Sequence, residues 1–174
     1  MIKRPDIRRL LPVLLAQYLL NPGGIHGVPH WGRVLENGRR LAADTGADLA
    51  VIELFALFHD ACRRKDGHDP DHGPRGATLA WRMRVHTGLD DSQLSELVSA
   101  CEFHTSGPPA DASPTVLTCL DADRLDISRV GMRTRPELLF TVAAREPRNI
   151  AWAAGRAASL FIPAVCSEEW QWRP

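Results

Sequence analysis

Hydrophobic residues recur three and four positions apart along most of the chain, which is the spacing of one face of an α-helix. No segment alternates apolar and polar residues in the way a half-buried strand does. The pattern predicts helices at about 6–20, 29–44, 47–63, 74–87, 90–104, 114–127, 135–145 and 148–160. We therefore expect an all-α protein built as a helical bundle.

Polar segments rich in Gly and Pro separate these predicted helices. They read "NPGG" at 21–24, "KDGHDPDHGPRG" at 65–76 and "TSGPPADASP" at 105–114. None is long enough to be a linker, and no internal repeat is present. The pattern thus predicts one domain over residues 1–174, with the tail "SEEWQWRP" packing its two tryptophans back on the body.

The first residues, "MIKRPDIRRLLPVLLAQYLL", superficially resemble a secretory signal peptide. Their apolar stretch is interrupted by Pro12 and Gln17, and no small-residue cleavage site follows cleanly. We interpret the segment as an amphipathic helix of the mature protein. No apolar run approaches the 20 or so residues that a transmembrane helix needs.

Composition narrows the expected location and partners. The 21 basic and 21 acidic residues cancel, so the charge balance does not favour a nucleic-acid polymer or a membrane as partner. The four cysteines form no CxxC pair, which suits reduced thiols in the cytoplasm. The oligomeric state is left open by the sequence.

Four of the predicted helices carry a histidine or an aspartate on an otherwise apolar face. These residues are His30, His59 with Asp60 beside it, His104 and Asp121. One such residue alone is usually a core histidine or an aspartate paired with arginine. Burying several without compensation would cost roughly several kcal/mol each. A bound cation offsets that cost, so together they predict a metal site.

The local sequences around these residues resemble the motifs of the HD-domain superfamily of metal-dependent phosphohydrolases. In chain order they are "HWGRVLENGRRLA", "ALFHDACR", "DHGPRGA", "CEFHT" and "CLDADRLDI". The resemblance runs from about residue 25 to 130. It implies a helical bundle of the HD-domain type, with the helices of residues 135–174 packed on that core.

The resemblance also implies a set of metal ligands. One ion would be held by His30, His59, Asp60 and Asp121. A second would be held by His72 and His104, with Asp60 bridging the two. Some superfamily members bind one ion only, but both extra histidines stand in matching contexts here, which favours two. Fe, Mn, Co, Ni or Zn suit mixed histidine and carboxylate ligands better than Ca does.

The implied activity is hydrolysis of a small phosphate ester, with a nucleotide as the favoured class, by a metal-activated water, with Asp60 at the catalytic centre. We expect Arg63 and Arg124 to contact the substrate phosphate or to orient the ligand carboxylates. The roles of His26, His68 and His86 stay open, and His86 is a reserve ligand should His72 not bind metal.

Two other functions remain compatible with the sequence. Six ligands of this kind also occur in superfamily members that are di-iron oxygenases, similar to myo-inositol oxygenase, and that act on a small polyol or a phosphonate. The second alternative is a non-catalytic, metal-stabilised ligand-binding module. It stays open because function resides in the site and not in the fold.

Overall fold

The computed structural model describes residues 6–174, and the secondary structure within that range is helical throughout. The α-helices are α1 (Ile7–Leu15), α2 (Val28–Thr45), α3 (Leu49–Phe58), α4 (His72–Arg82), α5 (Arg84–Thr87), α6 (Asp91–Phe103), α7 (Pro114–Arg124), α8 (Val142–Arg145), α9 (Pro147–Ala158) and α10 (Ala164–Glu168). Two short 3-10 helices are η1 (Ile127–Val130) and η2 (Pro136–Leu138). The predicted all-α class is confirmed.

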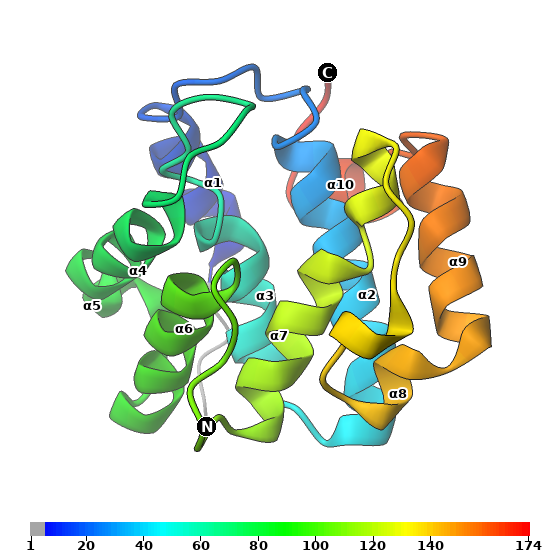
Figure 1. Cartoon of the computed structure of the whole chain (residues 1–174). Helices are drawn as coiled ribbons and strands as arrows, with labels where there is room; N and C mark the ends of the chain where they lie inside the picture. The colour runs from blue at the N-terminus through cyan, green and yellow to red at the C-terminus, as the bar shows by residue number, and fades with distance from the viewer. Residues whose placement is uncertain (1–5) are drawn as a thin grey trace.

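Helices α2, α3, α6 and α7 form the centre of the bundle, because α2 packs on α3 and α7 while α6 packs on α3, α4 and α7. Figure 1 shows α4 and α5 covering one side of this group and α8 and α9 covering the other. Large side chains such as Trp31, Phe55 and Leu97 are fully buried between them. The N-terminal end of α2 and the C-terminal end of α7 lie at the same end of the bundle, the upper end in Figure 1.

Capping residues mark the helix ends that the sequence pattern predicts. Asp48 accepts hydrogen bonds from the first amides of α3, and Asp90 forms a capping box with Gln93 at the start of α6. Ser113 caps α7 in front of a proline. Gly46, with φ at 70°, ends α2 in the left-handed conformation that favours glycine.

Four predicted helices differ from the observed ones, and the first of them, predicted at 6–20, ends at Leu15. The helix predicted at 47–63 ends at Phe58, and the helix predicted at 74–87 divides at Met83 into α4 and α5. The segment 135–145 is not one helix, because Leu139 is extended between η2 and α8. The amides that follow Leu139 bond to an α7 carboxylate instead of to a helical carbonyl.

The last residues pack back on the body of the bundle. Helix α10, which the sequence pattern did not predict, contacts α2. Trp170 is buried and Trp172 packs against the core, as expected for the tail. Among residues 6–174, no helix combines the length and the apolar character needed to cross a bilayer.

Candidate metal centre

His59 directly follows the last residue of α3, and its ring hydrogen-bonds to the last turn of that helix. Its Nδ1 atom is 3.1 Å from the carbonyl oxygens of both Phe55 and Ala56, in the last turn of the helix. A carbonyl only accepts, so Nδ1 carries the hydrogen. The Nε2 atom of His59 is left with its lone pair and points away from the helix.

Three other buried histidines are held in the same way. Nδ1 of His30 donates to Oδ2 of Asp126 at 2.7 Å, and Nδ1 of His104 donates to the carbonyl of Cys101 at 2.7 Å. Nδ1 of His72 donates to the Asp69 carbonyl at 2.5 Å. Such acceptors fix the tautomer of metal-binding imidazoles in proteins generally. In each of the four rings, Nε2 is therefore the atom turned toward the other side chains of the site.

The free Nε2 atoms meet in two pairs. His30 and His59 face one another with 3.1 Å between their Nε2 atoms, and His72 and His104 do so at 2.8 Å. Two lone pairs at this distance repel unless a cation or a proton lies between them. The pairs are therefore electrostatically incomplete and fit a positive ion.

Asp60 lies between the two histidine pairs and turns one carboxylate oxygen toward each. Its Oδ2 atom is 3.7 and 3.9 Å from Nε2 of His30 and His59. Its Oδ1 atom is 3.1 and 3.9 Å from Nε2 of His72 and His104. We call His30, His59 and Asp60 the first triad, and Asp60, His72 and His104 the second triad. All five residues are buried.

The electrostatics keep His59, His104 and Asp60 in the forms that bind metal, whereas they favour the protonated form of His72. Burial lowers the pKa of His59 to about 3 and also lowers that of His104. Burial alone would raise the pKa of Asp60, but His59 and hydrogen bonds from His26 and His72 outweigh it and hold that pKa well below its usual range. Burial alone would lower the pKa of His72, and the hydrogen bond and charge of Asp60 raise it instead.

The aspartate of α7 that approaches the first triad is Asp123, not the predicted Asp121. Oδ1 of Asp123 is 3.4 Å from Nε2 of His30 and 3.9 Å from Nε2 of His59. Residues two apart on an α-helix are about 200° apart around its axis, so these two aspartates point in opposite directions. The prediction of Asp121 as a ligand is corrected on this geometry.

Asp121 anchors the chain that follows η2. Its carboxylate accepts hydrogen bonds from the amides of Phe140 and Thr141, both at 2.8 Å, and from the Thr141 hydroxyl at 2.7 Å. Burial raises the pKa of Asp121 despite these bonds. Both oxygens are thus occupied by the backbone, and the residue has a structural role.

The prediction for Arg124 is also corrected. Its guanidinium lies over the ring of Phe140 and donates to the carbonyl of Leu138 at 3.1 Å, on the Asp121 side of α7. An arginine that does lie beside the triads is Arg129, just after the same motif. It donates to the carbonyl of Ile25 at 2.9 Å and lines the pocket described below.

Arg63 lies against the second triad. Its Nη1 atom is 3.3 Å from Oδ1 of Asp60 and 3.0 Å from Nε2 of His72. Its Nη2 atom donates to the carbonyl of Gly67 at 3.2 Å. Arg63 therefore contacts a carboxylate of the triads, which is one of the two roles expected for it.

Two glycines of the "HGPRGA" segment let α4 approach the other helices closely. A Cβ atom on Gly73 would lie 2.7 Å from the carbonyl oxygen of Cys101, at the end of α6. One on Gly76 would lie 2.6 Å from the carbonyl oxygen of Phe58, at the end of α3. Any residue with a Cβ atom would clash with a backbone oxygen at these two positions, so only glycine fits there. These approaches bring His72 beside the other donors.

The triads open into a pocket of about 650 Å³. Three triad residues line it, Asp60, His72 and His104, together with the nearby Asp123. His26, Arg63, His68 and Arg129 also line it. His26 turns Nδ1 toward Oδ2 of Asp60 at 3.0 Å and Nε2 toward the carbonyl of Asp66 at 3.2 Å. Both ring nitrogens of His26 therefore face oxygen atoms and not the histidine pairs, so His26 is not one of the triad donors. The reserve ligand His86 is exposed on α5, outside this pocket.

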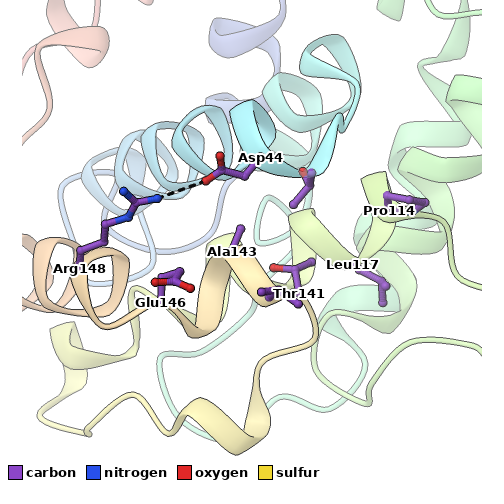
Figure 2. A pocket seen from close by; sticks show the side chains of 9 residues that line it. Asp44, Pro114, Leu117, Thr141, Ala143, Glu146 and Arg148 are labelled. Atoms are coloured by element: carbon purple, nitrogen blue, oxygen red, sulfur yellow. Dashed lines mark ion pairs between the residues drawn. The ribbon is translucent and has the colours of Figure 1, made fainter.

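A separate pocket of about 430 Å³ lies on the far side of α7 (Figure 2). Its walls come from the end of α2, the start of α7 and the α8–α9 segment, and they include Thr141, the partner of Asp121. Asp44 and Arg148 form an exposed ion pair across its edge at 3.8 Å. None of its lining residues is a histidine, and it shares no residue with the pocket of the triads.

Comparison with known proteins supports the resemblance seen in the sequence motifs. The solved structure of a predicted HD superfamily hydrolase from an uncultured Thermotogales bacterium superposes with a TM-score of 0.64 and is 27% identical in sequence. The match covers 89% of this chain and 88% of that one. The chain therefore has an HD-type helical fold, and this similarity supports the resemblance of its motifs to those of the HD-domain superfamily. No family model and no curated protein matches the sequence.

Within this HD-type fold, the resemblance in sequence and the geometry agree on most of the site. The structure brings together His30, His59, Asp60, His72 and His104 from four separated motifs. Sequence reasoning missed Asp123, Asp126 and Arg129. All three stand in or just after "CLDADRLDI", so the motif was found and the residue within it was misassigned.

Proposed function

We propose that this chain is a metal-dependent phosphohydrolase that cleaves a small phosphate ester, of which a nucleotide is the leading class. The observation that carries the proposal is the pair of buried triads that share Asp60 and turn their Nε2 lone pairs toward one another. When bound there, one or two divalent transition-metal ions would polarise a phosphoryl oxygen and lower the pKa of a water molecule toward neutrality.

The donor atoms fit such ions. Imidazole nitrogen mixed with carboxylate oxygen suits Fe, Mn, Co, Ni or Zn. Asp60 would be shared between two ions, because each of its oxygens faces a different histidine pair. The proposed donors are His30, His59, Asp60 and Asp123 for one ion and Asp60, His72 and His104 for the other.

The pocket supports an anionic substrate of small size. Its volume of about 650 Å³ is in the range of small-molecule and cofactor sites. Arg129 lines the same pocket as Asp123, where its guanidinium would bind phosphoryl oxygens and offset charge that develops during displacement. His68 lies on the exposed loop that borders the pocket, where it would act as a general acid toward the leaving group.

The similar structure is described as a predicted hydrolase, which supports hydrolysis as the reaction class. The phosphate ester is proposed from the chemistry of the donors and the arginine. The compartment proposed for the reaction is the cytoplasm, where the free thiols of the four cysteines would stay reduced.

A metal-loaded nucleotide panel tests the proposal. Full-length protein loaded with Mn²⁺ or Co²⁺ should release phosphate from at least one nucleoside phosphate, and Asp60→Ala and His59→Ala should abolish the release. His86→Ala is the matched control, because that histidine is exposed on α5, outside the pocket. Full activity in Asp60→Ala would refute the assignment. Oxygen consumption by iron-loaded protein, or tight nucleotide binding without turnover, would replace the proposed reaction with an oxygenase or a binding module.

A further inference from the structure

The guanidinium of Arg63 contacts two of the atoms that the second triad offers to an ion. These atoms are Oδ1 of Asp60, at 3.3 Å, and Nε2 of His72, at 3.0 Å. The side chain of Arg63 is 12% exposed, and the carbonyl of Gly67 holds its other terminal nitrogen. A positive charge is therefore held against the donors and not in solvent.

The two triads are unequal in charge as a result. Beside the first triad stands Asp123, whose carboxylate adds negative charge 3.4 Å from His30. The second triad includes no carboxylate other than Asp60, which it shares with both the first triad and Arg63, although the charge of Asp123 also reaches His104. A divalent ion in the second triad would meet less negative charge and one nearby positive charge.

We infer that Arg63 sets the affinity of the second triad for a divalent ion by competing for its donor atoms. The first triad then binds its ion tightly, and the ion of the second triad is held more weakly and exchanges. This inference rests on the metal centre proposed above. A unit charge a few ångströms from an ion changes its affinity by more than about tenfold, even at the effective dielectric constant of about 20 found near protein surfaces.

The opposite role for Arg63 gives the opposite result. If the guanidinium served only to orient the carboxylate of Asp60, its removal would loosen a ligand and weaken binding in the second triad. The sign of the change in affinity therefore distinguishes a competing cation from a positioning residue.

Calorimetric titration of the metal-free, full-length protein with Mn²⁺ tests the inference. The native protein should bind one ion tightly and a second at least about tenfold more weakly. Arg63→Met should tighten the second ion by at least about tenfold and leave the first unchanged. Arg63→Gln should act in the same way, whereas Arg63→Lys should keep the weak second site. Arg64→Met is the matched control, because Arg64 is the exposed neighbour in the same loop.

Adding His104→Ala to Arg63→Met should remove the tightened ion, which assigns it to the second triad. Circular dichroism would verify that each variant is folded. The inference is overturned if both charge-removing variants weaken the second ion or leave it unchanged, while the tight first ion keeps the proposed metal centre intact. If the native protein binds no ion at all, the metal centre and this inference both fail.

Discussion

Oδ2 of Asp126 lies 2.7 Å from Nδ1 of His30, and the same carboxylate accepts two hydrogen bonds from Arg33. His30 and Arg33 share a face of α2 because they are three residues apart. One aspartate after α7 therefore fixes the tautomer of His30 and neutralises a buried arginine. The pKa of Asp126 is held below its usual range because hydrogen bonds and charge from His30 and Arg33 outweigh burial. This contact turns Nε2 of His30 toward His59.

Replacing Asp126 should weaken metal binding although this residue does not face the ions. We expect Asp126→Asn to lower the affinity of the first triad by about 10- to 100-fold, as for other groups that orient metal-binding histidines. Its melting temperature should also fall, because Arg33 is left with less compensation for its buried charge. Metal titration of folded Asp126→Asn measures the first effect. Asp111→Asn, an exposed change in a loop, is the control and should alter neither quantity.

The two aspartates of α7 should separate metal binding from stability. Asp123→Asn should reduce the metal content of the purified protein with little change in its folding, because Asp123 faces the triads. Asp121→Asn should retain the metal. It should lose about 1–3 kcal/mol of unfolding free energy, since an amide cannot accept all the hydrogen bonds from Phe140 and Thr141.

Elemental analysis and urea unfolding of these two variants make the comparison. Metal loss in Asp121→Asn together with full metal content in Asp123→Asn would contradict the assignment. Asp121, the ligand first predicted from the sequence motif, would then be the metal-binding aspartate of α7.

The glycines of α4 give a matched pair of substitutions. Gly76→Ala should destabilise the protein by about 1–3 kcal/mol, because its Cβ atom would lie 2.6 Å from a backbone oxygen of Phe58 and force α4 outward. Gly155→Ala should stabilise it by about 0.5–1 kcal/mol, because that position is helical and open. Thermal melting measures both. Equal effects of the two changes would show that α4 is not packed as closely as the structure has it.

Removal of the metal should lower the stability of the protein. An ion that binds only the folded state stabilises it by about 2.7 kcal/mol when the ion is at 100 times its dissociation constant. Prolonged dialysis against a chelator should therefore lower the melting temperature, and Mn²⁺ or Co²⁺ should restore it. In His59→Ala, which lacks one donor of the first triad, the melting temperatures with and without metal should differ much less. The same shift in His59→Ala as in the native protein would place the ion elsewhere.

Much of the fold follows from local rules that the sequence displays. The three-and-four spacing predicts the central helices because each buries one apolar stripe, and residues such as Asp90 and Ser113 mark where they begin. The spacing failed at 135–145, where the amides of Phe140 and Thr141 bond to Asp121 across 19 and 20 residues of sequence. No local pattern carries such a long-range contact.

The sequence predicted a metal ligand correctly where a motif offered only one candidate residue. Each histidine of the triads is the one histidine of its motif, and only for His72 was a reserve, His86, considered. Helix α7 offered Asp121 and Asp123, with Asp126 one turn further on, and it is buried around most of its circumference. Apolar periodicity cannot select a face on such a helix. The neighbouring choice of Arg124 over Arg129 failed for the same reason.

The central claim is that the two triads hold metal ions, and elemental analysis of the protein purified without added metal or chelator tests it most directly. The account predicts at least one transition-metal ion per chain in the native protein, with a second appearing as the metal concentration is raised, and loss of both in Asp60→Ala. A native protein that stays free of transition metal when dialysed against Mn²⁺, Co²⁺, Fe²⁺, Ni²⁺ or Zn²⁺ would contradict it.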